Sequence, residues 1–139
     1  MYREEEFSRL EISLPACLEN YRYFRSKLAD TTKLLVLVKA NAYGHGCENI
    51  IKILDKKVDF FAVHNLQEAL NVRKNTNKTI LILGYCYDLK IAIENDISIM
   101  VDSVEILNQI TQLKTNKKAK IHIKINTGMN RLGIKKIKK

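Results

Sequence analysis

Five consecutive aliphatic residues, Leu34 to Val38, constrain the fold of this chain more than any other feature. A strand without a polar face has to be covered on both sides, and parallel sheets flanked by helices provide that environment. Four more short apolar segments follow it, at Asp59–Val63, Thr79–Leu83, Ser98–Val101 and Ala119–Ile125. We therefore expect five strands, most of them buried on both faces.

Segments with apolar residues at helical spacing separate these strands. We expect helices at about Cys47–Asp55, from Asn65 to about Lys74, around Leu89–Ile93 and from Asp102 to Leu113. Asn65 followed by Glu68, and Asp102 followed by Glu105, resemble helix-capping signals. Regular alternation without a Rossmann glycine fingerprint favours an α/β barrel. About five of the eight strands of a closed barrel are present, so we expect the N-terminal part of a (β/α)8 TIM-type barrel.

The segment before the first barrel strand is predicted to hold two elements. Arg9 to Leu14 alternates apolar and polar residues, which indicates a half-buried strand. Pro15 suits the first turn of a helix. That helix, with its apolar stripe at Leu18, Tyr21, Phe24 and Leu28, is expected to end near Asp30 to Thr32.

Composition narrows the class of protein and its surroundings. With 46% hydrophobic and 28% charged residues, the chain is expected to be globular rather than disordered. We expect no membrane segment and a cytoplasmic location, since no apolar run approaches the roughly 20 residues of a membrane span and the N-terminus lacks a signal-peptide core. Three widely spaced cysteines, Cys17, Cys47 and Cys86, favour reduced thiols over disulfides or a metal site.

The net charge of +9 raises the alternative of a basic nucleic-acid-binding module. The lysines are spread along the chain, however, and only Lys135–Lys139 forms a basic cluster, for which a solvated end is the simpler interpretation. We expect no nucleic-acid partner. Strong, salt-dependent binding to DNA or RNA would support the alternative.

Lys39 is the main candidate for chemistry, because it ends the Leu34–Val38 strand and opens a polar turn. The turn contains Asn41, Tyr43, Gly44, His45 and Gly46. The simplest interpretation is a lysine that carries its amine to solvent at a strand end. A partly desolvated lysine can instead act as a nucleophile towards a carbonyl, which is the chemistry of a Schiff base.

Two motifs carry a resemblance to a known family. VKANAYGHG, Val38 to Gly46, resembles the pyridoxal phosphate attachment motif of alanine racemases, and KINTGMNRLG, Lys124 to Gly133, resembles a second signature of that family. The similarity includes RLEISLPACLENY near the start and extends over nearly the whole chain. Since the family has a barrel followed by a β-rich domain, it implies that residues 1–139 are an incomplete N-terminal barrel domain, with the C-terminal β domain absent.

The resemblance implies roles for four residues. Lys39 would hold pyridoxal 5′-phosphate as a Schiff base and then serve as the base on one face of the substrate, while Tyr43 would bind the cofactor phosphate. Arg131 would lie near the cofactor ring oxygen and the substrate carboxylate, and Lys124 would be carbamylated and hold Arg131. The simpler alternatives are an aromatic cover of the strand end for Tyr43 and an exposed loop arginine for Arg131. His64 and His122 are expected to be structural, with no metal bound.

By the same resemblance, the function is that of an alanine racemase fragment. The family interconverts L-alanine and D-alanine and supplies D-alanine for peptidoglycan, and its complete members are homodimers in which the second base comes from the partner. Asn126 departs from the aspartate that is most common at its place. A noncatalytic remnant that binds pyridoxal phosphate through Lys39 is the alternative.

Overall fold

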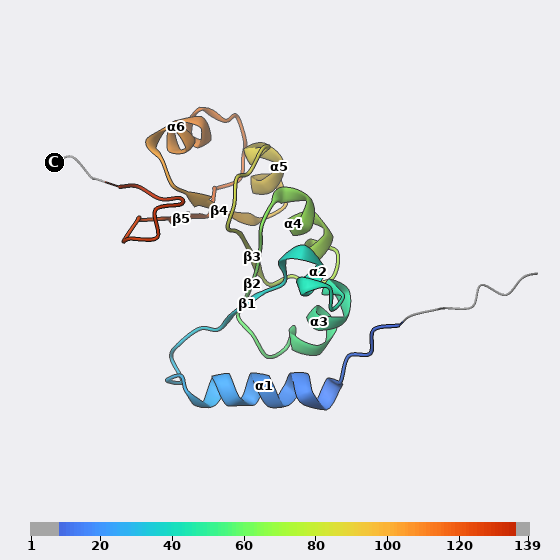
Figure 1. The fold of residues 1–139 in the computed structure, drawn as a ribbon. Helices are drawn as coiled ribbons and strands as arrows, with labels where there is room; N and C mark the ends of the chain where they lie inside the picture. Colours follow the sequence, from blue (N-terminus) through green and yellow to red (C-terminus); the bar gives the residue numbers. More distant parts are fainter. Residues whose placement is uncertain (1–8, 136–139) are drawn as a thin grey trace, which may run out of the picture.

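Five parallel strands form a single sheet in the computed structural model, which describes residues 9–135 (Figure 1). The strands are β1 (Leu35–Leu37), β2 (Phe60–Val63), β3 (Thr79–Ile82), β4 (Ile97–Val101) and β5 (Ile121–Ile123), and they lie side by side in chain order. Every neighbouring pair is parallel. The predicted α/β class and the five strands of a partial barrel are therefore confirmed.

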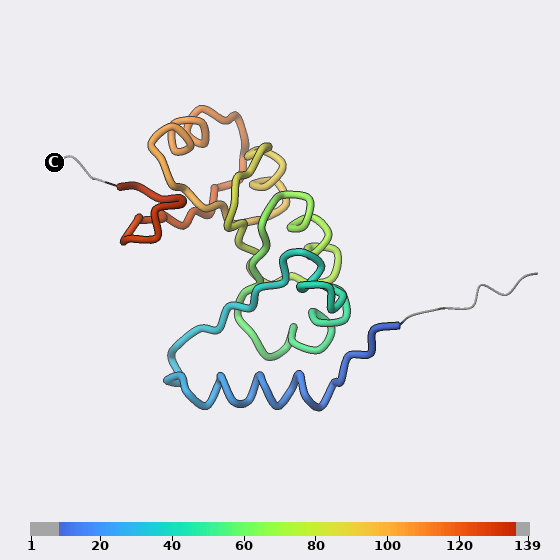
Figure 2. The backbone as a smooth tube through the Cα atoms, in the orientation of Figure 1, coloured from blue at the N-terminus to red at the C-terminus, as the bar shows by residue number. Residues whose placement is uncertain are grey.

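Helices connect the strands and lie along one side of the sheet (Figure 1). They are α3 (Cys47–Leu54), α4 (Leu66–Arg73), α5 (Leu89–Glu94) and α6 (Val104–Gln112), with α1 (Leu14–Ser26) before β1 and a short turn, α2 (Lys39–Tyr43), after it. Figure 2 follows this winding from α1, past α3, to the loop near residue 130. Each strand therefore ends at the same end of the sheet, and the next helix begins near that end.

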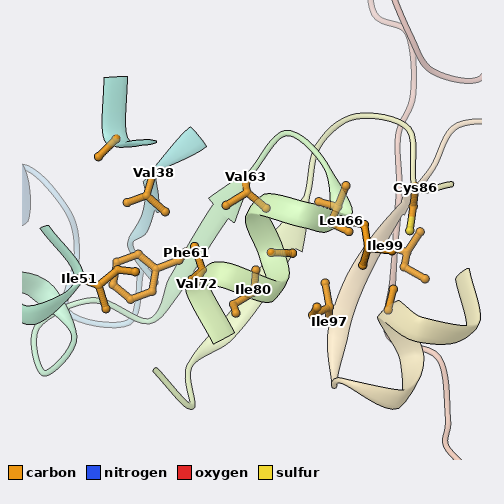
Figure 3. Close-up of a cluster of buried hydrophobic side chains, with 14 of the residues drawn as sticks. Val38, Ile51, Phe61, Val63, Leu66, Val72, Ile80, Cys86, Ile97 and Ile99 are labelled. Atoms are coloured by element: carbon orange, nitrogen blue, oxygen red, sulfur yellow. The ribbon is translucent and has the colours of Figure 1, made fainter. Parts of the chain in front are cut away.

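The core lies between the sheet and these helices (Figure 3). The register pairs Phe61 with Ile80 and Ile80 with Ile97, so that a row of large side chains crosses the sheet. Helix residues cover this row, among them Ile51, Leu66 and Val72, which are fully or almost fully buried. Alternate strand residues point to the opposite face.

The central strands are buried as predicted, but the outer two are not. β2, β3 and β4 are buried along almost their whole length. In β1, Leu35 and Leu37 are 37% and 42% exposed, and all of β5 is exposed. The expectation that Leu34–Val38 is buried on both faces is therefore wrong. Within residues 9–135 each outer strand has a neighbour on one side only, so its side chains lack cover that the central strands receive.

Two further predictions at helix starts are wrong. Residues 9–13 form no strand, and Ser13 instead caps α1 by accepting from the Ala16 N–H. At α6 the capping oxygen comes from Ser103 rather than Asp102. In both places the residue before the helix is a serine. Its hydroxyl oxygen accepts a hydrogen bond from a backbone N–H that has no other partner in the helix. α1 also ends at Ser26, earlier than expected.

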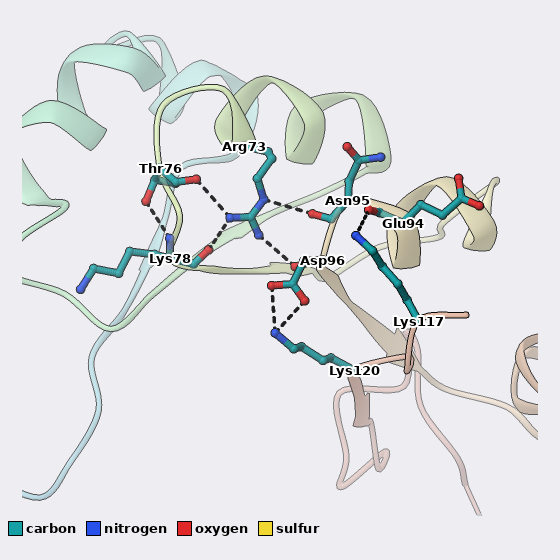
Figure 4. A network of polar contacts seen from close by, with 8 residues as sticks. All are labelled: Arg73, Thr76, Lys78, Glu94, Asn95, Asp96, Lys117 and Lys120. Carbon is teal, nitrogen blue, oxygen red and sulfur yellow. Dashed lines mark hydrogen bonds and ion pairs between the residues drawn. The ribbon is translucent and has the colours of Figure 1, made fainter. Parts of the chain in front are cut away.

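Polar side chains fasten the amino ends of the strands (Figure 4). The Arg73 guanidinium donates to four backbone carbonyls, those of Thr76, Lys78, Asn95 and Asp96. Beside it, Lys120 Nζ lies 2.7 Å from Asp96 Oδ1. These contacts tie the C-terminal end of α4 to the loops that lead into β3, β4 and β5.

Within residues 9–135, none of the helices is long and apolar enough to cross a membrane. The same residues contain no group of three or more histidine, cysteine or acidic side chains placed to bind a metal ion. The predicted basic cluster at 135–139 lies, apart from Lys135, outside the described residues.

Candidate functional site

The two sequence motifs lie at the same end of the sheet. Lys39 follows β1 at its carboxyl end, and the loop 126–133 follows β5 at its carboxyl end. Because all five strands are parallel, these ends form one rim. The motifs are on the two outer strands of the described sheet, with β2, β3 and β4 between them.

The chain after Lys39 forms a left-handed turn. Ala40, Asn41, Ala42 and Tyr43 have φ values of 49°, 53°, 54° and 56°, and Gly44 continues the series at 87°. For residues other than glycine this conformation costs roughly 1–2 kcal/mol each, so the turn has to be held by its surroundings. Such strain is concentrated at functional sites more often than elsewhere.

Polar contacts among residues 41–47 stabilise the end of the turn. The Asn41 side-chain oxygen accepts from the Cys47 N–H at 2.8 Å, and the Asn41 carbonyl accepts from the Gly46 N–H at 3.0 Å. His45 Nδ1 lies 3.0 Å from the Ala42 carbonyl oxygen. The turn is thereby joined to the start of α3.

The turn brings Lys39 and Tyr43 together. Lys39 Nζ lies 5.6 Å from the centre of the Tyr43 ring, within the range of a cation–π contact. Lys39 is half-buried, whereas Tyr43 is 57% exposed. An amine and a phenol ring thus lie side by side at the rim.

A carboxylate binds the start of the turn. Glu68 Oε1 accepts from the Ala40 N–H at 2.8 Å, and Glu68 Oε2 accepts from the His64 N–H at 2.7 Å. Glu68 is in the first turn of α4 and is half-buried. Burial, with a smaller contribution from the Glu68 charge, raises the pKa of the nearby Cys47 thiol. The sequence predicts Glu68 only as part of a helix cap, although its position in the first helical turn after β2 is a signal that it could reach the rim.

The loop 126–133 is closed by Asn126. Its side-chain oxygen accepts from the Gly128 and Asn130 N–H groups at 3.0 and 3.1 Å, and its amide nitrogen donates to Asn130 Oδ1 at 3.0 Å. Aspartate could accept the two N–H groups but could not donate the third bond. Gly133, at φ 113°, approaches so closely that a Cβ there would lie 2.8 Å from the Asn126 nitrogen.

Arg131 and Lys124 are at the rim but apart from Lys39. Arg131 is exposed on the closed loop, and Lys124 donates its N–H to the Val101 carbonyl at 2.8 Å, extending the β4–β5 ladder by one residue. In residues 9–135, no hydrogen bond or ion pair joins either side chain to Lys39 or Tyr43. The structure brings together the first pair of predicted site residues and leaves the second pair across the sheet.

The fold and rim define a part of a TIM-type barrel with a lysine at the carboxyl end of its first strand. The family model for the N-terminal domain of alanine racemase matches residues 12–139, and the chain belongs to this family. Alanine racemase 1 of Caldanaerobacter subterraneus is 36% identical over 132 residues, which cover 91% of this chain and 34% of that protein. Alanine racemase of Methanococcus maripaludis is 41% identical over 129 residues, which cover 88% and 35% of the two chains.

Solved structures show the same similarity. Alanine racemase of Bacillus anthracis, with bound L-Ala-P, superposes with a TM-score of 0.81 at 31% identity over 88% of this chain and 33% of that one. Alanine racemase of Clostridium difficile gives a TM-score of 0.76 at 36% identity over the same shares. The chain spans about a third of the length of the relatives it matches.

Proposed function

We propose that this chain supplies the lysine-bearing part of an alanine racemase that depends on pyridoxal phosphate and interconverts L-alanine and D-alanine. The observation that carries the proposal is the strained turn that presents Lys39 beside Tyr43 at the carboxyl ends of the strands. Family membership supports the substrate, and barrel enzymes place their reactive groups at this end.

The residues present suit the cofactor chemically. Lys39 Nζ would hold the aldehyde carbon as a Schiff base with loss of water, and Tyr43 would donate its hydroxyl to the phosphate. When bound, pyridoxal phosphate supplies an electron sink for the bond that is broken at the substrate carbon. Lys39, once released, would take or return the proton on one face of that carbon.

Arg131 and Lys124 complete the proposal on the other side of the rim. The Arg131 fork would bind a carboxylate or the cofactor ring oxygen. Lys124, if carbamylated, would carry negative charge and hold that arginine. We also propose that residues 1–139 correspond to the N-terminal barrel domain, that the complete enzyme is a cytoplasmic homodimer, and that its D-alanine serves peptidoglycan synthesis.

The test is borohydride trapping of pyridoxal phosphate on the purified chain, with the adduct mapped by mass spectrometry and D-alanine measured in parallel. We expect an adduct at Lys39 that is lost in Lys39→Ala. Lys33→Ala is the matched control, because Lys33 lies before the amino end of the same strand. An adduct without D-alanine would favour the noncatalytic alternative, and absence of the adduct would overturn the proposal.

A further inference from the structure

Glu68 makes two contacts that its local sequence does not predict. A glutamate three residues after a helix N-cap ordinarily bonds back to the amide of the cap residue. Here one half of that arrangement is present, since the Asn65 side chain accepts from the Glu68 N–H at 3.0 Å. The Glu68 carboxylate, however, reaches outside the helix, to His64 and to Ala40, which is 28 residues away in the chain.

We propose that Glu68 is a positioning residue for Lys39, which holds the left-handed turn against the β2 loop by accepting two backbone N–H groups on one carboxylate. This inference rests on the proposed function for its consequence at Lys39, but the contact itself does not depend on it. It assigns to the carboxylate a role at the rim beyond helix capping.

The Ala40 amide needs an acceptor from outside its own turn. The first N–H groups of any helical turn have no partner within that turn. Ala40 immediately follows Lys39, so the acceptor fixes the backbone next to the reactive side chain. A carboxylate is the stronger choice, since hydrogen bonds to an ionised acceptor are shorter and stronger than those between neutral groups.

The second N–H group anchors Glu68 to a rigid part of the rim. The His64 carbonyl accepts from the Gly84 N–H at 2.9 Å, so both the N–H and the carbonyl of His64 are hydrogen-bonded. A Cβ at Gly84 would lie 2.5 Å from the His64 oxygen, so this close approach requires glycine. Glu68 thus connects the strained turn after β1 to the loops after β2 and β3.

The test measures amide hydrogen exchange by NMR in the full chain, without cofactor. In Glu68→Gln one oxygen that accepts becomes an NH₂ group that faces a donor. We expect exchange at Ala40 and His64 to become about tenfold faster or more, while Ile82 in β3 is unchanged. Glu105→Gln is the matched control, because Glu105 is also a first-turn helix glutamate beside a capping side chain.

Glu68→Asp separates positioning from overall stability. It keeps the charge but is shorter, so we expect protection to survive at one of the two amides. Unchanged exchange at Ala40 and His64 in Glu68→Gln would overturn the proposal. An equal loss at Ala40, His64 and Ile82 in both Glu68 variants would also overturn it, because Glu68 would then support only the fold as a whole.

The same variants are then loaded with pyridoxal phosphate and reduced. We expect the yield of the Lys39 adduct to fall about tenfold in Glu68→Gln and to be unchanged in Glu105→Gln. If the unaltered chain forms no adduct while Ala40 and His64 still respond in exchange, the proposed function fails but the Glu68 contact stands. If exchange responds and the adduct yield does not, the positioning of Lys39 is refuted.

Discussion

The two ends of the sheet are fastened by side chains of opposite charge. At the carboxyl end the Glu68 carboxylate accepts from two backbone N–H groups, whereas at the amino end the Arg73 guanidinium donates to four backbone carbonyls. The repeating strand-helix unit accounts for part of the difference, since Ala40 lies in the first turn of α2 and Asn95 ends α5. Helices begin near the carboxyl ends of the strands and leave N–H groups unpaired there, and they end near the amino ends and leave carbonyls unpaired.

The ends also differ in backbone strain. Four consecutive residues other than glycine, residues 40–43, have positive φ at the carboxyl end. At the amino end Asp96 has φ 56°, as a single residue after α5. The amino end therefore carries less backbone strain than the carboxyl end, where the strained turn follows Lys39.

The largest effect on stability is expected from Arg73→Ala. It removes the four hydrogen bonds that the guanidinium donates to carbonyls between α4, β3 and β4. We expect the free energy of unfolding to fall by about 2–4 kcal/mol, measured by urea denaturation. Arg22→Ala, at an exposed position of α1, should change it by less than about 0.5 kcal/mol. Equal losses of unfolding free energy in the two variants would show that Arg73 does not stabilise the amino end of the sheet.

A smaller effect of opposite sign is expected from Ala40→Gly. Glycine adopts the left-handed conformation without strain, although it loses more chain entropy on folding. We expect the free energy of unfolding to rise by about 0.5–1 kcal/mol, measured by thermal or urea denaturation. Ala16→Gly in the right-handed α1 should instead destabilise by about 0.5–1 kcal/mol. If Ala40→Gly also destabilises the protein, the backbone at Ala40 is not strained.

The smallest effect is expected from the ion pair at the amino end. The hydrogen bond from Lys120 is the main cause that lowers the pKa of Asp96. A carboxyl with a lowered pKa contributes stability above its unfolded pKa, near 3.8, and this stability is lost as the pH falls further through the folded value. Because Asp96 is largely exposed, Asp96→Asn should cost only about 0.5 kcal/mol at pH 7.

A pH series of urea unfolding measures this effect, in low and in high salt. Below the folded pKa the unaltered chain and Asp96→Asn should have the same stability, and salt should reduce their difference at pH 7. Asp30→Asn, at an exposed position after α1, is the control. A difference that persists at low pH would mean that Asp96 acts through packing rather than charge.

Much of the fold could be predicted because it depends on the pattern of residues close together in the sequence. The apolar runs at β2, β3 and β4 and the helical stripes between them gave the correct elements and, through their alternation, the parallel sheet. The strand expected at Arg9–Leu14 could not be tested by alternation alone, because a strand also needs a neighbour to pair with. The burial of β1 failed for the same reason, since it depends on what lies beside the strand.

The candidate site was predictable in part. Lys39 and Tyr43 were identified from the motif, and the structure places them in contact, but their proposed roles stay predictions. Gly44 and Gly46 have positive φ, which glycine adopts without strain, whereas the left-handed turn also takes in Ala40, Asn41, Ala42 and Tyr43. Of these residues only Asn41 is of a type that often adopts the left-handed region. Hydrogen bonds with Glu68 and Cys47 accompany the conformation.

The sequence by itself determined the order of the elements, the strand ends at which the polar residues lie, and the family to which they are similar. These depend on hydrophobic periodicity and on local capping, which involve residues a few positions apart. Only the tertiary structure decided that Glu68 binds the amide of Ala40, and that Lys39 leaves β1 in a left-handed turn. The hydrogen bond from Ala40 to Glu68 joins segments far apart in the chain, so its geometry exists only once β1 and β2 have paired.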